Sequence, residues 1–233
     1  MPSRRQLLAA GTVTAAIAGS GGYLTLTVGD DEYTAAPSSI PSEVLQSTGY
    51  ELTERRDVDQ SRSISIAGVG RTIEVTNRRS IYEKPLDLGF GEFRVANVTV
   101  VSTPSIQILG EERNPVAGES DKEFARRAEA DSESLQNLER TSERTTTMLG
   151  QTVTVGRYRG VNRSNRLPVE VNIVAEIVDP IPHADGYVTA VCVYPTFIEQ
   201  SESENVTRML EHLRHGAPVE GKNDSARSGN RTG

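Results

Sequence analysis

The chain has 233 residues, of which 36% are hydrophobic and 24% charged, with a formal net charge of −7. This hydrophobic fraction can build the core of one domain, which excludes a chain that is disordered throughout. The acidic balance argues against nucleic-acid binding, because such binders carry a basic surface. A single cysteine excludes an internal disulfide framework.

Arginine supplies nearly all of the positive charge, since only Lys84, Lys122 and Lys222 are lysines. An acidic surface that is poor in lysine favours hydration in concentrated salt. The composition is therefore typical of a salt-adapted protein. A merely acidic mesophilic protein is the alternative, because a GC-rich genome also favours arginine over lysine.

Residues 1–29 have the pattern of an export signal. Arg4 and Arg5 precede a short, weakly apolar run that begins at Gln6, and acidic residues follow directly after Gly29. Paired arginines in this position are typical of the twin-arginine route, which carries folded proteins. We therefore expect the following domain to lie outside the cell membrane.

The fate of this segment after export is open. Cleavage between Ala18 and Gly19 would release the protein, because small residues precede that bond. Without cleavage the segment would tether the domain, since residues 6–29 would span about 36 Å as a helix and a bilayer core is about 30 Å thick. Ser20 stands where a lipoprotein would carry its lipidated cysteine, so we expect no lipid anchor.

The remaining chain is predicted to contain a linker at residues 30–39, a single α+β domain at 40–216 and a disordered tail at 217–233. The domain begins with a short helix at residues 42–48, which Gly49 stops. Residues 50–104 alternate in hydropathy and predict strands, with a hairpin around Gly68-Val69-Gly70.

The second half is predicted to repeat strands and a helix. Ser120 and Glu123 form a capping box, which predicts a helix from residue 120 to about Leu138 with Arg127 on its solvated side. A hairpin over 145–159 and strands over 167–178 and 186–197 should follow, with a last helix over 201–215 that Gly216 ends. These elements predict a large antiparallel β-sheet with helices packed on it, and an α/β/α sandwich is one such arrangement.

Apolar residues on both faces of the strand over 186–197 predict a central strand. Val188, Ala190 and Cys192 share one face, and Val191 and Val193 share the other. We interpret Cys192 as a buried structural thiol and not as a nucleophile.

No arrangement of residues predicts catalytic chemistry or a cofactor. His212 and His215 are one helical turn apart, and His183-Ala184-Asp185 adds a second pair, but histidines in a last turn are explained by the helix-end carbonyls. We therefore predict no metal site. Neither a nucleophile elbow nor a phosphate-binding loop is present.

Sequons begin at several asparagines; glycosylation is a hypothesis, and in an exported protein its acceptors would be Asn162, Asn223 and Asn230.

Several segments resemble an uncharacterised haloarchaeal family of exported proteins and lipoproteins. The twin-arginine start, Ser47-Thr48-Gly49-Tyr50, Ser102-Thr103-Pro104 and Val191-Cys192-Val193-Tyr194-Pro195 carry the likeness. The resemblance implies export but no assigned activity. The sheet, the Tyr194-Pro195 exit and the last helix are also similar to the PsbP-like group of α/β/α sandwiches, a likeness that implies no shared function.

Two functions remain open at this stage. The favoured one is a non-enzymatic binding or envelope-maintenance domain outside the membrane, with an unknown envelope or extracellular partner and no nucleic acid. The alternative is an extracytoplasmic hydrolase whose site forms from Glu and Asp residues only in three dimensions. A cleft with converging carboxylates or histidines would favour the hydrolase, and a flat convex surface the binding domain.

Overall fold

A computed structural model describes residues 12–16, 23–27, 32–66, 69–87, 91–108, 111–114, 116–131, 134–163 and 170–216. Arg4, Arg5, Ala18, Gly19, Asn223 and Asn230 lie outside these ranges, so the export signal, its cleavage and the tail sequons remain predictions. Among the described residues, no helix is both long and apolar enough to cross a membrane.

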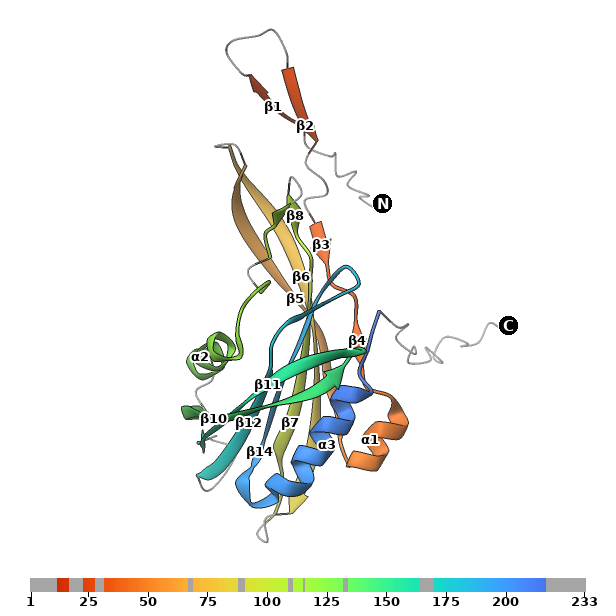
Figure 1. Cartoon of the computed structure of the whole chain (residues 1–233), viewed down its shortest axis with the longest axis vertical. Helices are drawn as coiled ribbons and strands as arrows, with labels where there is room; N and C mark the ends of the chain where they lie inside the picture. Colours follow the sequence, from red (N-terminus) through yellow and green to blue (C-terminus); the bar gives the residue numbers. More distant parts are fainter. Residues whose placement is uncertain are drawn as a thin grey trace, which may run out of the picture.

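The domain is built on one nine-stranded sheet, whose central path runs β10-β11-β12-β14-β7-β6-β3 (Figure 1). Its strands are β3 (Glu32–Thr34), β5 (Glu51–Ile66), β6 (Val69–Asp87), β7 (Glu92–Pro104), β10 (Leu135–Met148), β11 (Gln151–Asn162), β12 (Val171–Val178), β13 (Ile181–His183) and β14 (Gly186–Pro195). β5 pairs with β6, and β13 pairs with β14. Every pairing is antiparallel except that of β3 with β6, which makes the sheet mixed. The predicted large antiparallel sheet is thus confirmed apart from this one short strand.

Short strands complete the structure. β1 (Thr12–Ala16) pairs with β2 (Tyr23–Thr27), and β8 (Gln107–Ile108) pairs with β9 (Glu111–Glu112). β4 (Ser38–Ser39) pairs with β15 (Arg214–His215). The segment 30–39, which the sequence analysis assigned to a linker, therefore contains β3 and β4, and Ala35 and Ser38 within it are buried.

The central strand is β14, which lies between β12 and β7. Ala190 and Cys192 are fully buried in the larger core, whereas Val193 is buried in the smaller core on the opposite face. The period of two in the sequence predicted this double burial, because both faces of a central strand need apolar side chains.

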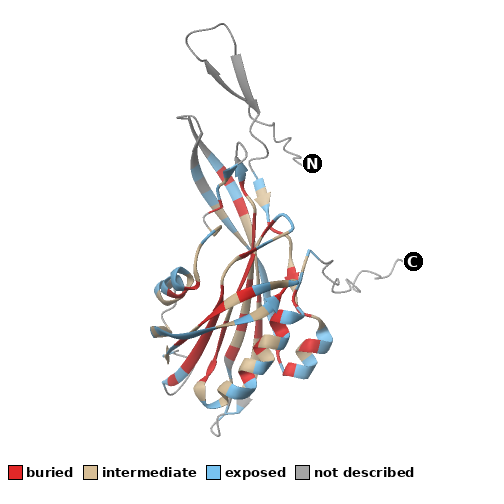
Figure 2. Cartoon of the chain, viewed as in Figure 1, coloured by how far each residue is buried: buried red, intermediate tan, exposed pale blue. Residues whose placement is uncertain are grey.

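Helices cover both faces of the sheet, so the fold is an α/β/α sandwich (Figures 1 and 2). On one face, α1 (Ser42–Thr48) and α3 (Glu199–Glu211) pack over the larger core, and the short 3-10 helix η1 (Thr196–Ile198) leads into α3. On the other face, α2 (Asp121–Asp131) buries Ala125 against β11, β12 and β14.

The structure corrects the predicted extent of the helix that starts at Ser120. α2 ends at Asp131, and Leu135 and Leu138 instead lie on β10, from which they pack against the smaller core. β10 contains two register shifts, which interrupt the alternation of its side chains between the two faces of the sheet. Leu135 and Leu138 can therefore share one face although they are three residues apart, which is the spacing that predicted a helix.

The last helix is also shorter than predicted. α3 ends at Glu211, and the chain turns so that β15 pairs with β4. Gly216 has a φ of 78° and donates its N–H to the Pro37 carbonyl. His215 is therefore a strand residue and does not follow His212 along one helix face.

Gly156 on β11 gives the start of α2 room to dock. The Asp121 carboxylate accepts hydrogen bonds from Tyr158 at 2.8 Å and from Arg140 at 2.9 Å, and the Asp121 N–H donates to Asp179 at 2.7 Å. A Cβ at residue 156 would lie 1.7 Å from the Asp121 carboxylate and 2.9 Å from its Cβ. Asp121 therefore docks α2 only because residue 156 has no side chain.

We predict that Gly156→Ala destabilises the protein by about 1–3 kcal/mol, the usual cost of forcing extra volume into a packed site. Urea unfolding measures the change. If the contact with Asp121 is the cause, adding Asp121→Ala to the variant should produce clearly less than the sum of the two single effects. Additive effects would contradict this explanation.

Candidate functional site

The face of the sheet that carries α2 is only partly covered. α2 contacts β10, β11 and β12, whereas β5, β6 and β7 continue beyond it at the other side of the sheet. The segment between β7 and α2 contains β8 and β9, and its Asn114 side chain donates a hydrogen bond to Thr103 of β7. A cavity lies where this segment, α2 and the uncovered strands meet.

We name this cavity of about 300 Å³ the arginine pocket. Its volume is at the lower end of the range for small-molecule sites. It is lined by Arg56, Val58 and Gln60 of β5, Val75, Asn77 and Arg79 of β6, Val101 and Thr103 of β7, Thr189 of β14, Ile106, Asn114, Val116, and Phe124 and Arg127 of α2.

Three arginines line the pocket from two sides. Arg56 and Arg79 are directly opposite each other on β5 and β6. Arg127 reaches the pocket from α2, where its guanidinium lies 5.3 Å from the centre of the Phe124 ring. Like charges placed directly opposite on two strands repel each other, so the arrangement favours a bound anion.

The three arginines differ in how far they are neutralised by the protein. Arg56 pairs with Glu54 at 3.1 Å, and Arg127 pairs with Glu119. Arg79 has no ion pair within the described part of the chain, and its Nε is buried without a hydrogen-bond partner. Burial lowers the pKa of Arg79, and the neighbouring Arg56 lowers it further. Arg79 is therefore the arginine of the three whose charge the protein itself neutralises least.

The neighbouring Asn77 adds a second unpaired polar atom. Its Oδ1 is buried and accepts no hydrogen bond from the described residues. Buried polar atoms are normally paired, so each exception calls for an explanation. Asn77 and Arg79 both line the arginine pocket, so both unpaired atoms belong to residues of its wall.

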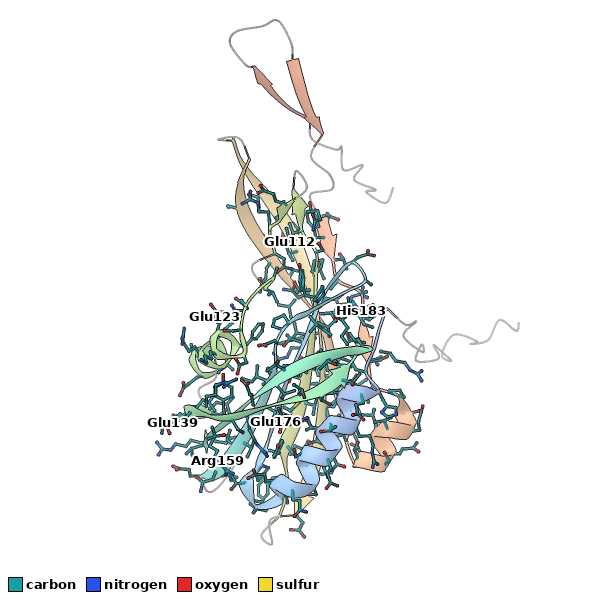
Figure 3. All side chains as sticks on the ribbon, viewed as in Figure 1. Glu112, Glu123, Glu139, Arg159, Glu176 and His183 are labelled. Carbon is teal, nitrogen blue, oxygen red and sulfur yellow. The ribbon has the colours of Figure 1, made fainter. Side chains whose placement is uncertain are left out.

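The outer wall of the pocket is held in place by Glu112 on β9, which Figure 3 labels. Its carboxylate accepts hydrogen bonds from Ser105, from the Ile106 N–H at 3.0 Å and from the Asn114 N–H at 2.7 Å. The Asn114 side chain in turn donates to Thr103 on β7 at 2.8 Å. Ile106 and Asn114 are thereby fixed against the sheet before any ligand arrives.

The carboxylates that are most deeply buried lie on the opposite face, under α3. Glu176 accepts hydrogen bonds from Arg144 at 2.6 Å and from Tyr194 at 3.0 Å (Figure 3). Glu202 accepts from Lys84 at 2.6 Å and from Tyr50 at 2.9 Å. Both carboxylates are matched by cations, and neither lines the arginine pocket.

The structure separates the histidines that were considered for a metal. His212 is exposed and its Nδ1 lies 2.9 Å from the Arg208 carbonyl, which fits the helix-end role expected for it. His215 instead lies beside His183, with their Nδ1 atoms 3.0 Å apart. Burial and the neighbouring His183 lower the pKa of His215. The sequence analysis did not consider this pair.

Cys192 and Asn162 lie apart from the pocket. Burial raises the pKa of Cys192, as does the nearby Glu176, so the thiol stays protonated in its strand. Asn162 ends β11 at intermediate exposure. Arg127 is exposed as expected, but it also lines the pocket, which the sequence analysis did not foresee. Arg56 and Arg79 were not singled out at all.

We predict that Glu112→Gln removes an acid-sensitive contribution to stability. Partial burial disfavours the ionised carboxylate, but the hydrogen bonds from Ser105, Asn114 and Ile106 outweigh it and lower the pKa of Glu112 below its ordinary value of 4.5. A carboxyl with a lowered pKa stabilises the folded state above its unfolded pKa and loses this effect as the pH falls through its folded pKa.

Urea unfolding between pH 7 and pH 3 tests this prediction. The variant should be less stable than the wild type at neutral pH, and the difference should shrink in acid. Glu111→Gln is the matched control, because Glu111 is exposed and, among the described residues, its ion pair is with Arg113 on the surface. A difference that stays constant with pH would contradict the role of Glu112.

The comparisons with known proteins identify a family but no activity. No curated protein matches the chain. Among solved structures, the solution structure of cyanobacterial PsbP (CyanoP) from Synechocystis sp. PCC 6803 is similar at 14% identity with a TM-score of 0.34, over 78% of this chain and 92% of that one. A family model described as a domain of unknown function, DUF6517, matches residues 37–214. The chain therefore belongs to the DUF6517 family.

Proposed function

We propose that this chain is a non-enzymatic binding domain that acts outside the cell membrane, and that the arginine pocket binds a small organic anion with an apolar portion. The observation that carries the proposal is that three arginines line one cavity, and that one of them, Arg79, has a buried Nε without a hydrogen-bond partner among the described residues. The cavity differs from the flat surface that the sequence analysis associated with a binding domain.

The lining divides into two chemical parts. Arg56, Arg79 and Arg127 present N–H donors in the planar geometry that matches a carboxylate or a phosphate. Six of the other eleven lining residues are apolar, namely Val58, Val75, Val101, Ile106, Val116 and Phe124. Charge and apolar surface together select an amphipathic anion over a fully hydrated inorganic one.

The same lining argues against hydrolysis. Within the described residues, it includes no carboxylate, histidine or cysteine that would act as a base or nucleophile. The hydroxyl of Thr103 accepts a hydrogen bond from Asn114. Guanidinium groups bind and orient anions, but at neutral pH they do not take up protons.

The proposed location outside the cell membrane rests on the N-terminal sequence and on the net charge of the chain. Arg4 and Arg5 before a short apolar run favour twin-arginine export. The acidic, lysine-poor composition and the resemblance to a haloarchaeal family favour a salty exterior, with either a released domain or one tethered through residues 1–29. An envelope or extracellular molecule with an anionic group would then be the partner.

Octanoate binding should depend on Arg79. We predict that Arg79→Met weakens binding of octanoate by about 10- to 100-fold, because a hydrogen bond to a charged group contributes about 1.5–3 kcal/mol. Methionine keeps much of the length and apolar surface of the arginine stem. Isothermal titration calorimetry at one fixed salt concentration measures the dissociation constants.

Two controls separate the pocket from general charge effects. Arg208→Met changes the net charge equally on an exposed site of α3 and should leave octanoate binding unchanged. Octan-1-ol has a chain of the same length without the anion and should bind much more weakly than octanoate. Equal binding of the acid and the alcohol, or equal losses in both variants, would disprove the proposed site.

Export should depend on the paired arginines. We predict that the double substitution Arg4→Lys and Arg5→Lys keeps the protein inside the cell, although it preserves the positive charge. Fractionation of the producing cells and the intact mass of the protein measure the outcome. The control is the same double substitution at Arg126 and Arg127, and undiminished export of the Arg4/Arg5 variant would refute the assigned route.

A further inference from the structure

Two histidines that are 32 residues apart in sequence meet beside β15. His183 closes β13, and His215 lies on β15 next to β4 (Figure 3 labels His183). Their Nδ1 atoms are 3.0 Å apart, and the ring planes are inclined at 63°, so the rings meet through these nitrogens and are not stacked. The contact is a hydrogen bond in which one ring donates its Nδ1–H to the bare Nδ1 of the other ring.

The backbone attachment of β15 to the domain is short. Its two residues, Arg214 and His215, pair with β4, and the N–H of the following Gly216 donates to the Pro37 carbonyl at 2.9 Å. Leu213, directly before β15, is buried in the larger core, so a released segment would begin at Arg214. Because a ladder of two residues is a weak attachment, the side-chain contact with His183 contributes a large part of what holds β15 in place.

β4, in contrast, is fixed to the sheet by side-chain contacts. The Ser38 hydroxyl lies 2.7 Å from that of Ser102 on β7, and the Ser38 carbonyl accepts a hydrogen bond from Ser80 on β6 at 3.3 Å. Loss of the contact between the histidines would therefore free β15 and leave β4 where it is.

We propose that His183 and His215 form an acid-sensitive clasp, which holds β15 on the domain at neutral pH and releases it in mild acid. With both rings neutral, or with one ring charged, one Nδ1–H still meets a bare Nδ1 and the hydrogen bond is kept. A second proton leaves two Nδ1–H groups and two positive charges in contact, so the bond is lost. This proposal is independent of the arginine pocket.

The groups around His215 set the direction of its response to pH. Burial and the neighbouring His183 lower the pKa of His215 below its ordinary value of 6.5, although the Ala36 carbonyl before β4 and Asp185 in the turn after β13 act in the opposite direction. A histidine with a lowered pKa binds fewer protons in the closed clasp than on a released strand. Release is therefore favoured as the pH falls below 6.5.

The neighbouring surface charges contribute little to holding β15. Arg214 lies 4.0 Å from Glu43 of α1, and both side chains are more than half exposed. Exposed ion pairs of this kind contribute little to stability, so the histidine pair carries the attachment. His212 is exposed at the end of α3, where its Nδ1 lies 2.9 Å from the Arg208 carbonyl, and it provides a matched control outside the clasp.

Hydrogen exchange of the full chain at several pH values measures the release. The protection factor of the Gly216 amide should fall by about 10-fold per pH unit between pH 6 and pH 5, because the released strand binds one proton more than the closed clasp. Protection factors correct for the pH dependence of intrinsic exchange. Circular dichroism over the same range checks that the domain stays folded.

Asparagine at either position removes one imidazole and keeps a side-chain acceptor for the other. In His183→Asn and in His215→Asn, protection of the Gly216 amide should therefore stay constant or rise as the remaining histidine takes up a proton. His212→Asn should keep the pH profile of the wild type.

The ring-nitrogen chemical shifts of the wild type give a second readout that needs no variant. One of the two Nδ1 atoms of the clasp should carry a proton at pH 7, and both should carry one at the pH at which protection falls. The proposal is overturned if both Nδ1 atoms are bare at pH 7, or if wild-type protection is unchanged between pH 6 and pH 5. It is also overturned if the Asn variants at positions 183 and 215 lose protection in acid as the wild type does.

Discussion

The structure depends on the requirement that both faces of a wide sheet be removed from water. Seven adjacent strands, from β10 to β5, span about 29 Å at the usual strand spacing of about 4.8 Å. A helix is about 10 Å wide, so α2 alone covers about two strands of its face. The segment before α2 and the long side chains of β5 and β6 must cover the rest. The arginine pocket forms where that cover is incomplete.

The opposite face is closed by α1 and α3, and buried charge fixes α3 in place. Glu202 on α3 binds Lys84 of β6 and Tyr50, while Glu176 on β12 binds Arg144 of β10 and Tyr194 of β14. A buried carboxylate is costly unless cations and hydroxyls surround it, and removal of one partner leaves an uncompensated charge. Glu202 joins α3 to the sheet, and Glu176 joins strands within the sheet, which explains why burial alone does not identify an active site here.

The sequence correctly predicted the strands in which the side chains alternate regularly between the two faces of the sheet. β12 and β14 pair without a register shift, so the face of each side chain could be assigned from a period of two alone. The sequence analysis misplaced the ends of α2 and α3, because pairing of the following residues with distant strands decides where these helices end. Leu135 joins β10 because β11 is available, and His215 leaves α3 because β4 is available.

The pocket could not be predicted because it depends on hairpin register. If the turn were centred on Val69, as the sequence suggested, Arg56 would lie opposite Tyr82. The Arg56 side chain would then point to the face of the sheet that lies opposite the arginine pocket. The observed pairing joins Ile66 to Val69, which brings Arg56 opposite Arg79. A shift by an odd number of residues reverses the face of every side chain, so the whole arginine cluster depends on this one turn.

A basic pocket in an acidic chain is consistent with recognition at short range. At about 1 M salt the Debye length is about 3 Å, so the net charge of the protein neither repels nor attracts an anion over distance. Contacts between a guanidinium and an anion inside a partly dehydrated cavity are screened much less. Salts that are excluded from protein surfaces also strengthen the burial of apolar groups. Arg79 and the apolar wall formed by Ile106 and Phe124 would therefore both keep their effect at such salt concentrations, whereas long-range attraction would be lost.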